Sequence, residues 1–199
     1  GYSMAPGFEN VRQAIADNLN ARFNCNAKAS ELFMTCGCAP ALVSVAHALT
    51  ASPEDEFIAI APFFPEYNVF FTCAGAKLAV VPADTVHFQI DMDALEKTIN
   101  EHSVAVVINS PNNPSGVVYT EGTLKAIAEL LDRKSKEYGH PIYIIADEPY
   151  RELVYDGVKV TFIPTVYDNT IVCYSWSKSL SLPGERIGYV YVPEKCADA

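Results

Sequence analysis

Residues 143–150 read YIIADEPY, an uninterrupted apolar run that ends in two acidic side chains, a proline and a tyrosine. A strand that is apolar on both sides suits a sheet covered by helices on both faces. Six further short runs are rich in apolar and β-branched residues. The seven expected strands are 31–37, 57–63, 78–82, 104–110, 143–147, 170–175 and 187–192.

Segments with a helical period lie between these strands. The expected helices are 7–23, 39–50, 65–75, 91–100 and 120–139. The last has one apolar face, with Thr120 as its N-cap and Gly139 as its stop signal. Such alternation predicts a three-layer α/β/α sandwich with a mostly parallel central sheet. Ligands of such sheets bind beyond the carboxyl ends of the strands, so a site should follow the strands directly.

The composition excludes several classes of protein. The chain has 199 residues, half of them apolar, and a formal net charge of −10. This charge argues against nucleic-acid partners, which are held by clustered Lys and Arg. No apolar run approaches the roughly 20 residues of a membrane helix, and no signal segment opens the chain, so we expect a cytoplasmic protein. The spacing of the six cysteines and four histidines predicts neither a disulfide framework nor a metal site.

The segment SWSK, residues 175–178, follows an expected strand, and Arg186 comes eight positions after the lysine. A lysine at a strand end is by itself more often a solvated cation. Here Ser175 and Ser177 precede Lys178, and their hydroxyls together with the Arg186 fork suit a phosphate. This grouping predicts an anion site close to an amine.

Three other strand ends carry polar or flexible residues. Asp147 ends the apolar run at 143–147, where a carboxylate either caps a helix or pairs with a protonated ring nitrogen. The turn 109–116 reads NSPNNPSG and directs asparagines to the same rim. At 35–42 the chain reads TCGCAPAL, in which small residues lead into a helix whose N-terminal N–H groups can bind an anion.

Together these segments resemble the fold-type I enzymes that use pyridoxal 5′-phosphate (PLP), specifically the class I and II aminotransferase family. The resemblance covers nearly the whole chain, and the segments NNPSG, ADEPY and SWSK with the later arginine stand in the family's order. It implies an enzyme that moves an amino group between an amino acid and a 2-oxo acid, with PLP bound to Lys178 as a Schiff base.

The resemblance also implies a role for each matching residue. Lys178, Asp147 and Tyr150 are the expected catalytic residues, with Asp147 pairing with the pyridine nitrogen of PLP. Asn113 and Tyr150 match the groups that bind the phenolic oxygen. The expected phosphate seat comprises Gly37, Cys38, Ala39, Ser175, Ser177 and Arg186. Phe64 falls where the family stacks an aromatic ring on the cofactor, with Phe63 or Tyr67 as alternatives. Tyr2 resembles a tyrosine that reaches the phosphate of the neighbouring subunit, which implies a homodimer.

Residues 1–199 are therefore expected to form the PLP-binding large domain of a longer protein, without the family's N-terminal segment and C-terminal small domain. The family's arginine for the substrate carboxylate lies in that small domain, so the chain does not reveal which amino acid it uses. Two alternatives stay open: a carbon–sulfur β-lyase or another lyase on the same scaffold, and an aminotransferase-like domain of a transcription regulator.

Overall fold

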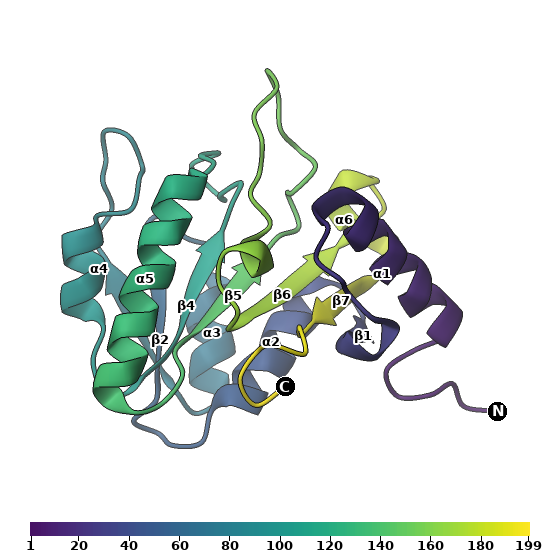
Figure 1. Ribbon diagram of the computed structural model, residues 1–199, viewed down its shortest axis with the longest axis horizontal. Helices are drawn as coiled ribbons and strands as arrows, with labels where there is room; N and C mark the ends of the chain where they lie inside the picture. The colour runs from purple at the N-terminus through teal and green to yellow at the C-terminus, as the bar shows by residue number, and fades with distance from the viewer.

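A computed structural model describes residues 1–199 and contains one seven-stranded sheet (Figure 1). The strands are β1 (Leu32–Thr35), β2 (Glu56–Ile60), β3 (Lys77–Val81), β4 (Ser103–Asn109), β5 (Tyr143–Asp147), β6 (Thr170–Ser175) and β7 (Gly188–Tyr191). Their order across the sheet is β1-β7-β6-β5-β4-β2-β3. β2 to β6 are parallel, and β7 runs antiparallel to both of its neighbours, β6 and β1. The predicted α/β fold with a mostly parallel sheet is confirmed.

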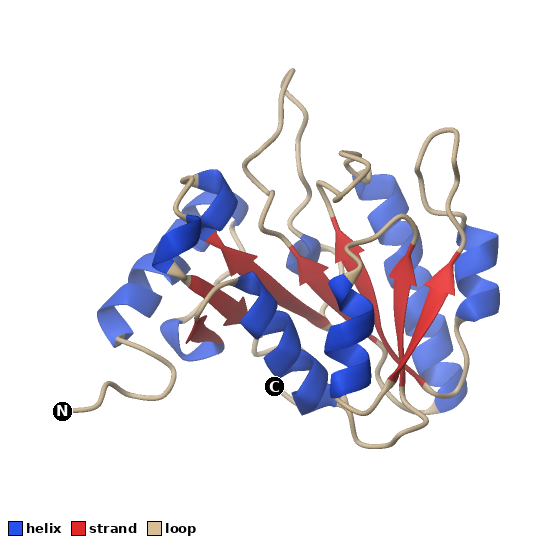
Figure 2. Cartoon of the chain, turned by 180° about the vertical axis from the view of Figure 1, so that it is seen from behind, coloured by secondary structure: helices blue, strands red, loops and turns tan.

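Helices cover both faces of the sheet. They are α1 (Glu9–Phe23), α2 (Cys38–Leu49), α3 (Glu66–Cys73), α4 (Met92–Thr98), α5 (Glu121–Tyr138) and the short α6 (Trp176–Ser179). Single 3₁₀ turns occur at Ala29–Glu31, Ile163–Thr165 and Pro183–Glu185. α2 and α3 pack on one face, whereas α4 and α5 pack on the other (Figures 1 and 2). α1 shares its apolar cluster with α5, so it belongs to the second face.

α5 shows how the local sequence specifies an element. The hydroxyl of Thr120 accepts a hydrogen bond from the Thr123 N–H at 3.1 Å, and Gly139 ends the helix with a φ of +79°. Leu124, Ile127 and Leu131 are almost fully buried. Burial of each such side chain contributes about 1.5–3 kcal/mol, which fixes the helix on the sheet.

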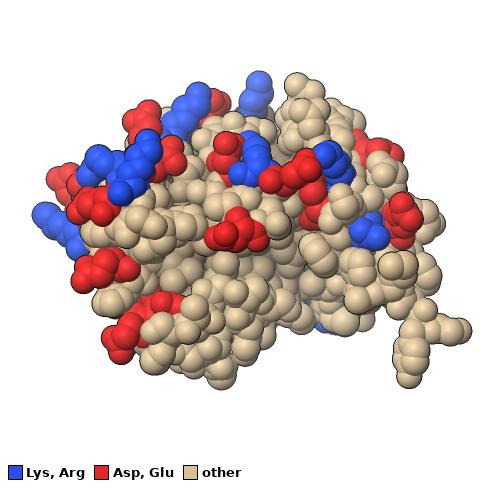
Figure 3. Space-filling view, turned by 60° about the horizontal axis from the view of Figure 1, so that its bottom comes forward, with Lys and Arg blue, Asp and Glu red and all other residues tan.

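The charged side chains are unevenly distributed. Figure 3 brings the lower edge of Figure 1 forward and shows acidic and basic groups intermixed over the upper part of the view, above a broad uncharged area. α5 carries many such groups, whereas α2 has no Asp, Glu, Lys or Arg. None of the helices combines the length and the apolar character needed to cross a bilayer.

The upper edge in Figure 1 collects the carboxyl ends of β4, β5 and β6. The long segment between β5 and β6 projects from this edge, and α6 follows β6 without an intervening residue. The sequence suggested that Lys178 lies at the end of a strand, but in the structure it lies in the four-residue helix that follows this strand. A single helical turn is too short to produce a periodic pattern.

Candidate active site

A cavity of about 290 Å³ opens at the carboxyl edge of the sheet. Its lining includes ten of the predicted cofactor residues: Cys38, Ala39, Phe64, Asn113, Asp147, Tyr150, Ser175, Ser177, Lys178 and Arg186. These residues come from five separate segments of the chain and meet because parallel strands end at the same edge. The volume is near the lower end of the roughly 300–1,000 Å³ typical of small-molecule sites.

Asp147 ends β5 and is 5% exposed. Its carboxylate accepts hydrogen bonds from the Tyr67 hydroxyl at 2.5 Å and from the Cys38 thiol at 3.0 Å. Both donors are neutral, and burial raises the pKa of Asp147 despite these two bonds. An ionised carboxyl group in such surroundings lacks a cationic partner, so the site favours a ligand that brings a positive charge.

Asn109, which the sequence did not single out, connects the ends of β4 and β5. Asn109, the last residue of β4, donates to the backbone carbonyl of Asp147 at 2.7 Å and accepts from the N–H of Asn113 at 2.6 Å. The ends of β4 and β5 are thus fixed relative to each other.

The pKa of Tyr150 is raised, first by burial and then by Asp147, while the Asn113 side chain acts in the opposite direction.

The candidate amine, that of Lys178, lies near Tyr150. The Lys178 Nζ lies 5.9 Å from the centroid of the Tyr150 ring. Ser175 and Ser177 precede Lys178 in sequence and line the same cavity, so the hydroxyls and the amine share one opening. Neighbouring strands β5 and β6 therefore bring together an acid, a phenol and an amine, the groups needed for proton transfer at a bound ligand.

The predicted anion seat lies where β1 leads into α2. Gly37 has a φ of +104°, and a Cβ on it would lie 2.6 Å from Arg186 Nη2. The guanidinium can therefore approach the start of α2 only because this position has no side chain. The first N–H groups of α2 have no partner within the helix, so Arg186 and the helix N-terminus together suit a phosphate.

Two aromatic residues at the start of α3 have distinct positions. Phe64 lines the cavity and packs edge-on against Tyr67, with ring centroids 5.8 Å apart. Tyr67 is almost fully buried and uses its hydroxyl on Asp147, a contact that the sequence did not predict. Of the three aromatic candidates for stacking, Phe64 is the one in the cavity lining.

Cys38 makes a side-chain contact that the sequence did not predict. Its backbone stays a predicted part of the phosphate seat, while its thiol donates to Asp147. Burial raises the pKa of this thiol well above its usual range, so it stays a neutral donor. No spacing rule connects a cysteine at a helix start to a carboxylate 109 positions later, and only the fold shows the contact.

Tyr2 lies apart from this site. Its side chain is fully exposed on the N-terminal tail, which extends away from the sheet (Figure 1). Within a single chain it contacts none of the cavity residues. Its predicted role at a neighbouring subunit stays a prediction.

The residues present fit PLP. The buried Asp147 carboxylate suits a protonated pyridine nitrogen, and Asn113 and Tyr150 suit the phenolic oxygen. Lys178 suits the aldehyde, and Arg186 with the start of α2 suits the phosphate. No three His, Cys, Asp or Glu side chains converge in the arrangement that would hold a metal ion.

Comparison with known proteins gives consistent matches over the whole chain. The family model described as "Aminotransferase class I and II" matches residues 1–199. A probable N-acetyl-LL-diaminopimelate aminotransferase from Bacillus subtilis is 33% identical over 198 residues, which are 98% of this chain and 48% of that protein.

Solved structures match equally broadly. An amino transferase from Eubacterium rectale superimposes with a TM-score of 0.98 at 60% identity and covers all of this chain with 50% of its own length. The aspartate aminotransferase of Thermus thermophilus with maleate gives a TM-score of 0.87 at 28% identity, over 97% of this chain and 49% of its own. The chain thus spans about half the length of the proteins that it matches.

Proposed function

Because the chain belongs to the class I and II aminotransferase family, we propose that residues 1–199 form the cofactor-binding large domain of a PLP-dependent aminotransferase. One observation carries the proposal most directly. A buried carboxyl group without a cationic partner, Asp147, shares a cavity with an amine, Lys178, and with the guanidinium of Arg186. These three groups match the ring nitrogen, the aldehyde and the phosphate of one molecule.

The chain's own residues divide the work of holding the cofactor. Arg186, Ser175, Ser177 and the N–H groups at the start of α2 bind the phosphate. Asp147 keeps the ring nitrogen protonated, because a proton there relieves the cost of its buried negative charge. Asn113 and Tyr150 orient the phenolic oxygen, and Phe64 covers the ring.

When bound, PLP supplies an electron sink for bond breaking at the α-carbon of an amino acid. Lys178 first holds the cofactor through its amine. Once a substrate amine had replaced it, the freed Nζ would be a base near the α-carbon, and it would take the proton from that carbon and deliver it to the former aldehyde carbon of the cofactor. The Tyr150 ring lies on one side of this amine, with its centroid 5.9 Å from Nζ.

The proposed substrates are an amino acid and a 2-oxo acid. The relatives include enzymes named for aspartate, prephenate and N-acetyl-LL-diaminopimelate, so the family's cofactor site accommodates different substrates. We expect the group that binds the substrate carboxylate to come from outside residues 1–199. We also propose a homodimer in the cytoplasm, where a reducing environment suits the six free cysteines.

A labelling experiment tests the proposal. Borohydride reduction of the PLP-loaded protein should fix the cofactor on Lys178, and peptide mass spectrometry should find the tag there. Lys178→Arg should abolish the tag, whereas Lys159→Arg, a change in the exposed segment between β5 and β6, should leave it unchanged.

A tag on another lysine would contradict the assigned site. The reaction class is tested separately by product analysis. An aminotransferase forms a new amino acid only when a 2-oxo acid acceptor is supplied, whereas a β-lyase releases ammonia and pyruvate without an acceptor.

A further inference from the structure

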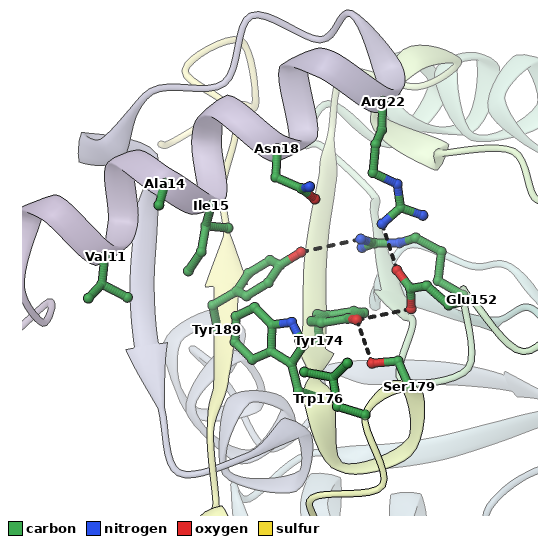
Figure 4. A pocket seen from close by; sticks show the side chains of 12 residues that line it. Val11, Ala14, Ile15, Asn18, Arg22, Glu152, Tyr174, Trp176, Ser179 and Tyr189 are labelled. Atoms are coloured by element: carbon green, nitrogen blue, oxygen red, sulfur yellow. Dashed lines mark hydrogen bonds and ion pairs between the residues drawn. The ribbon is translucent and has the colours of Figure 1, made fainter.

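A chain of hydrogen bonds crosses from the segment after β5 to α6 on the face of the sheet that carries α1 (Figure 4). Tyr174, in β6, stands at its centre. Its hydroxyl lies 2.9 Å from Glu152 Oε2 and 3.0 Å from Ser179 Oγ. Three separate segments therefore meet at one phenol.

The direction of these bonds follows from the donors available. An ionised carboxylate only accepts, so the single proton of Tyr174 goes to Glu152. The Ser179 hydroxyl must then donate to the Tyr174 oxygen. Burial raises the pKa of Tyr174, which keeps the phenol protonated and the sequence Ser179 to Tyr174 to Glu152 intact.

Glu152 is itself anchored from the other side. Arg22, near the end of α1, donates to its second carboxylate oxygen, Oε1, at 2.7 Å. Trp176 packs edge-on against Tyr174, with ring centroids 5.3 Å apart, and so covers the phenol from α6. Figure 4 shows these side chains lining one hollow, of about 460 Å³.

The charged groups of this hollow are already paired, which leaves few of them free to bind a ligand. Its two guanidinium groups already have carboxylate partners, Arg22 with Glu152 and Arg151 with Glu148. Arg151 also lies over the ring of Tyr174, 4.6 Å from its centroid. The charged groups here are thus paired with one another.

The two ends of the hydrogen-bond chain adjoin the candidate active site on the opposite face. Glu152 comes two residues after Tyr150, in the segment that begins at Asp147. Ser179 directly follows Lys178. Because side chains alternate along β6, Tyr174 faces the α1 side while Ser175 faces the cavity. The phenol therefore links, from behind the sheet, the segment that carries the acid and the helix that carries the amine.

We propose that Tyr174, with Glu152 and Ser179, is a positioning residue that holds the Lys178 helix in register with Asp147 and Tyr150. The inference rests on the proposed function. α6 has only four residues, so its own backbone bonds cannot hold it firmly. Without the link, Lys178 Nζ should spend less time in position to capture the PLP aldehyde, a step that forms a carbon–nitrogen double bond and releases one water.

Tyr174→Phe tests this directly, because it removes the hydroxyl and keeps the ring. Two ligands separate positioning from general damage: PLP, which reacts with the amine, and pyridoxamine 5′-phosphate, which has no aldehyde. Stopped-flow absorbance should show PLP capture slowed by about tenfold or more, since small misplacements of reacting groups cost that much. Affinity for pyridoxamine 5′-phosphate should change by less than about twofold, because the phosphate and ring contacts are untouched.

Matched variants complete the design. Tyr143→Phe removes a comparable hydrogen bond from a phenol to a carboxylate, that of Asp198, at the other end of β5. It should change neither the rate of PLP capture nor the affinity for pyridoxamine 5′-phosphate. Glu152→Gln keeps an oxygen that accepts from Tyr174 but sets its NH2 group against Arg22, so it should slow PLP capture less than Glu152→Ala, which should behave like Tyr174→Phe.

Hydrogen–deuterium exchange without cofactor gives a second readout. The N–H groups of Leu180 and Ser181 bond to carbonyls of Trp176 and Lys178, and they should exchange faster in Tyr174→Phe than in Tyr143→Phe. Unchanged exchange, or equal losses for both ligands, would overturn the positioning role. A wild type that binds neither ligand would instead refute the proposed function, and the exchange comparison would still decide whether the link holds α6.

Discussion

At the scale of single residues, Asp147 is the buried carboxyl group whose charge a bound ligand is most needed to balance. Its carboxyl group is buried beside two neutral donors, and burial raises its pKa. A carboxyl group with a raised folded pKa binds its proton more tightly in the folded state. The free energy of unfolding therefore falls as pH rises from the unfolded pKa of about 3.9 through the folded value.

Asp147→Asn should consequently have opposite effects with and without PLP. The cofactor-free variant should unfold at the same temperature as the wild type or higher at pH 7.5, with the difference vanishing near pH 4. The loaded variant should lose about a hundredfold or more in turnover, which corresponds to about two pKa units of stabilisation at the ring nitrogen. Thermal unfolding at both pH values and amino-transfer assays measure the two effects.

Asp132→Asn is a suitable control, because Asp132 is an exposed carboxylate on α5. It should alter neither the pH dependence nor turnover. Near-normal turnover of Asp147→Asn would show that this carboxylate serves another purpose.

The sequence predicted the residues around the cavity better than their contacts. Asp147, Lys178 and Arg186 could be found because each stands at a fixed offset from a strand that is easy to recognise. The contacts of Tyr67 and Cys38 with Asp147 could not, because they join segments whose proximity arises only when α2, α3 and β5 pack together. Asn109 was passed over because it ends a strand in a turn that already contained two other asparagines.

At the scale of elements, all seven expected strands and the five longer helices are present, with ends displaced by a few residues. Apolar runs and helical periods identify such elements because burial fixes which side chains face the core. α6 and the 3₁₀ turns were not predicted, because they are too short to show a helical period in their apolar residues. The antiparallel direction of β7 had no local signal, since it is set by pairing with β1 and β6.

The junction between β1 and α2 leads to a prediction at this scale. Gly37→Ala would place a Cβ 2.6 Å from Arg186 Nη2, at a φ of +104° that side chains rarely adopt. PLP should bind at least about tenfold more weakly, because strain of about 1–3 kcal/mol and a displaced guanidinium both disturb the phosphate seat. Pyridoxal, which lacks the phosphate, should lose much less affinity.

Equilibrium titration with both ligands makes the comparison. Gly122→Ala is the matched control, because Gly122 lies in the first turn of α5 with an ordinary φ, and a Cβ there would make only an ordinary contact, 3.7 Å from Thr120 Oγ1. Equal losses for PLP and pyridoxal in Gly37→Ala would mean that the junction does not act on the phosphate.

At the scale of the whole molecule, the chain matches about half of each related protein, and Tyr2 is fully exposed. We expect the full-length protein to be a homodimer in which Tyr2 reaches the partner's phosphate. Light scattering should give twice the subunit mass, and Tyr2→Phe should weaken PLP binding. Tyr155→Phe, an equally conservative change at another exposed tyrosine, should have no effect.

Residues 1–199 expressed alone should show little amino transfer, because we expect the group that binds the substrate carboxylate to come from outside them. Loss of that bidentate contact lowers turnover as well as binding, since binding energy helps to reach the transition state. Transfer by the monomeric chain at the rate of the full-length protein would refute both the missing contact and the shared site.

The pairing of β1 with β7 has a consequence for how the protein is made. Leu32 pairs with Tyr191, so β1 waits for about 160 further residues of chain to be synthesised, which takes roughly eight to thirty seconds. Gly37 lies two residues after the end of β1 and Arg186 two residues before the start of β7, so the two sides of the predicted phosphate seat come from the early and the late part of the chain. The nascent chain therefore completes the acid, phenol and asparagine positions before it can bind a phosphate. We therefore expect a phosphate-bearing cofactor to bind late in synthesis, and until β7 has emerged the unpaired β1 edge is open to chaperones and to other chains.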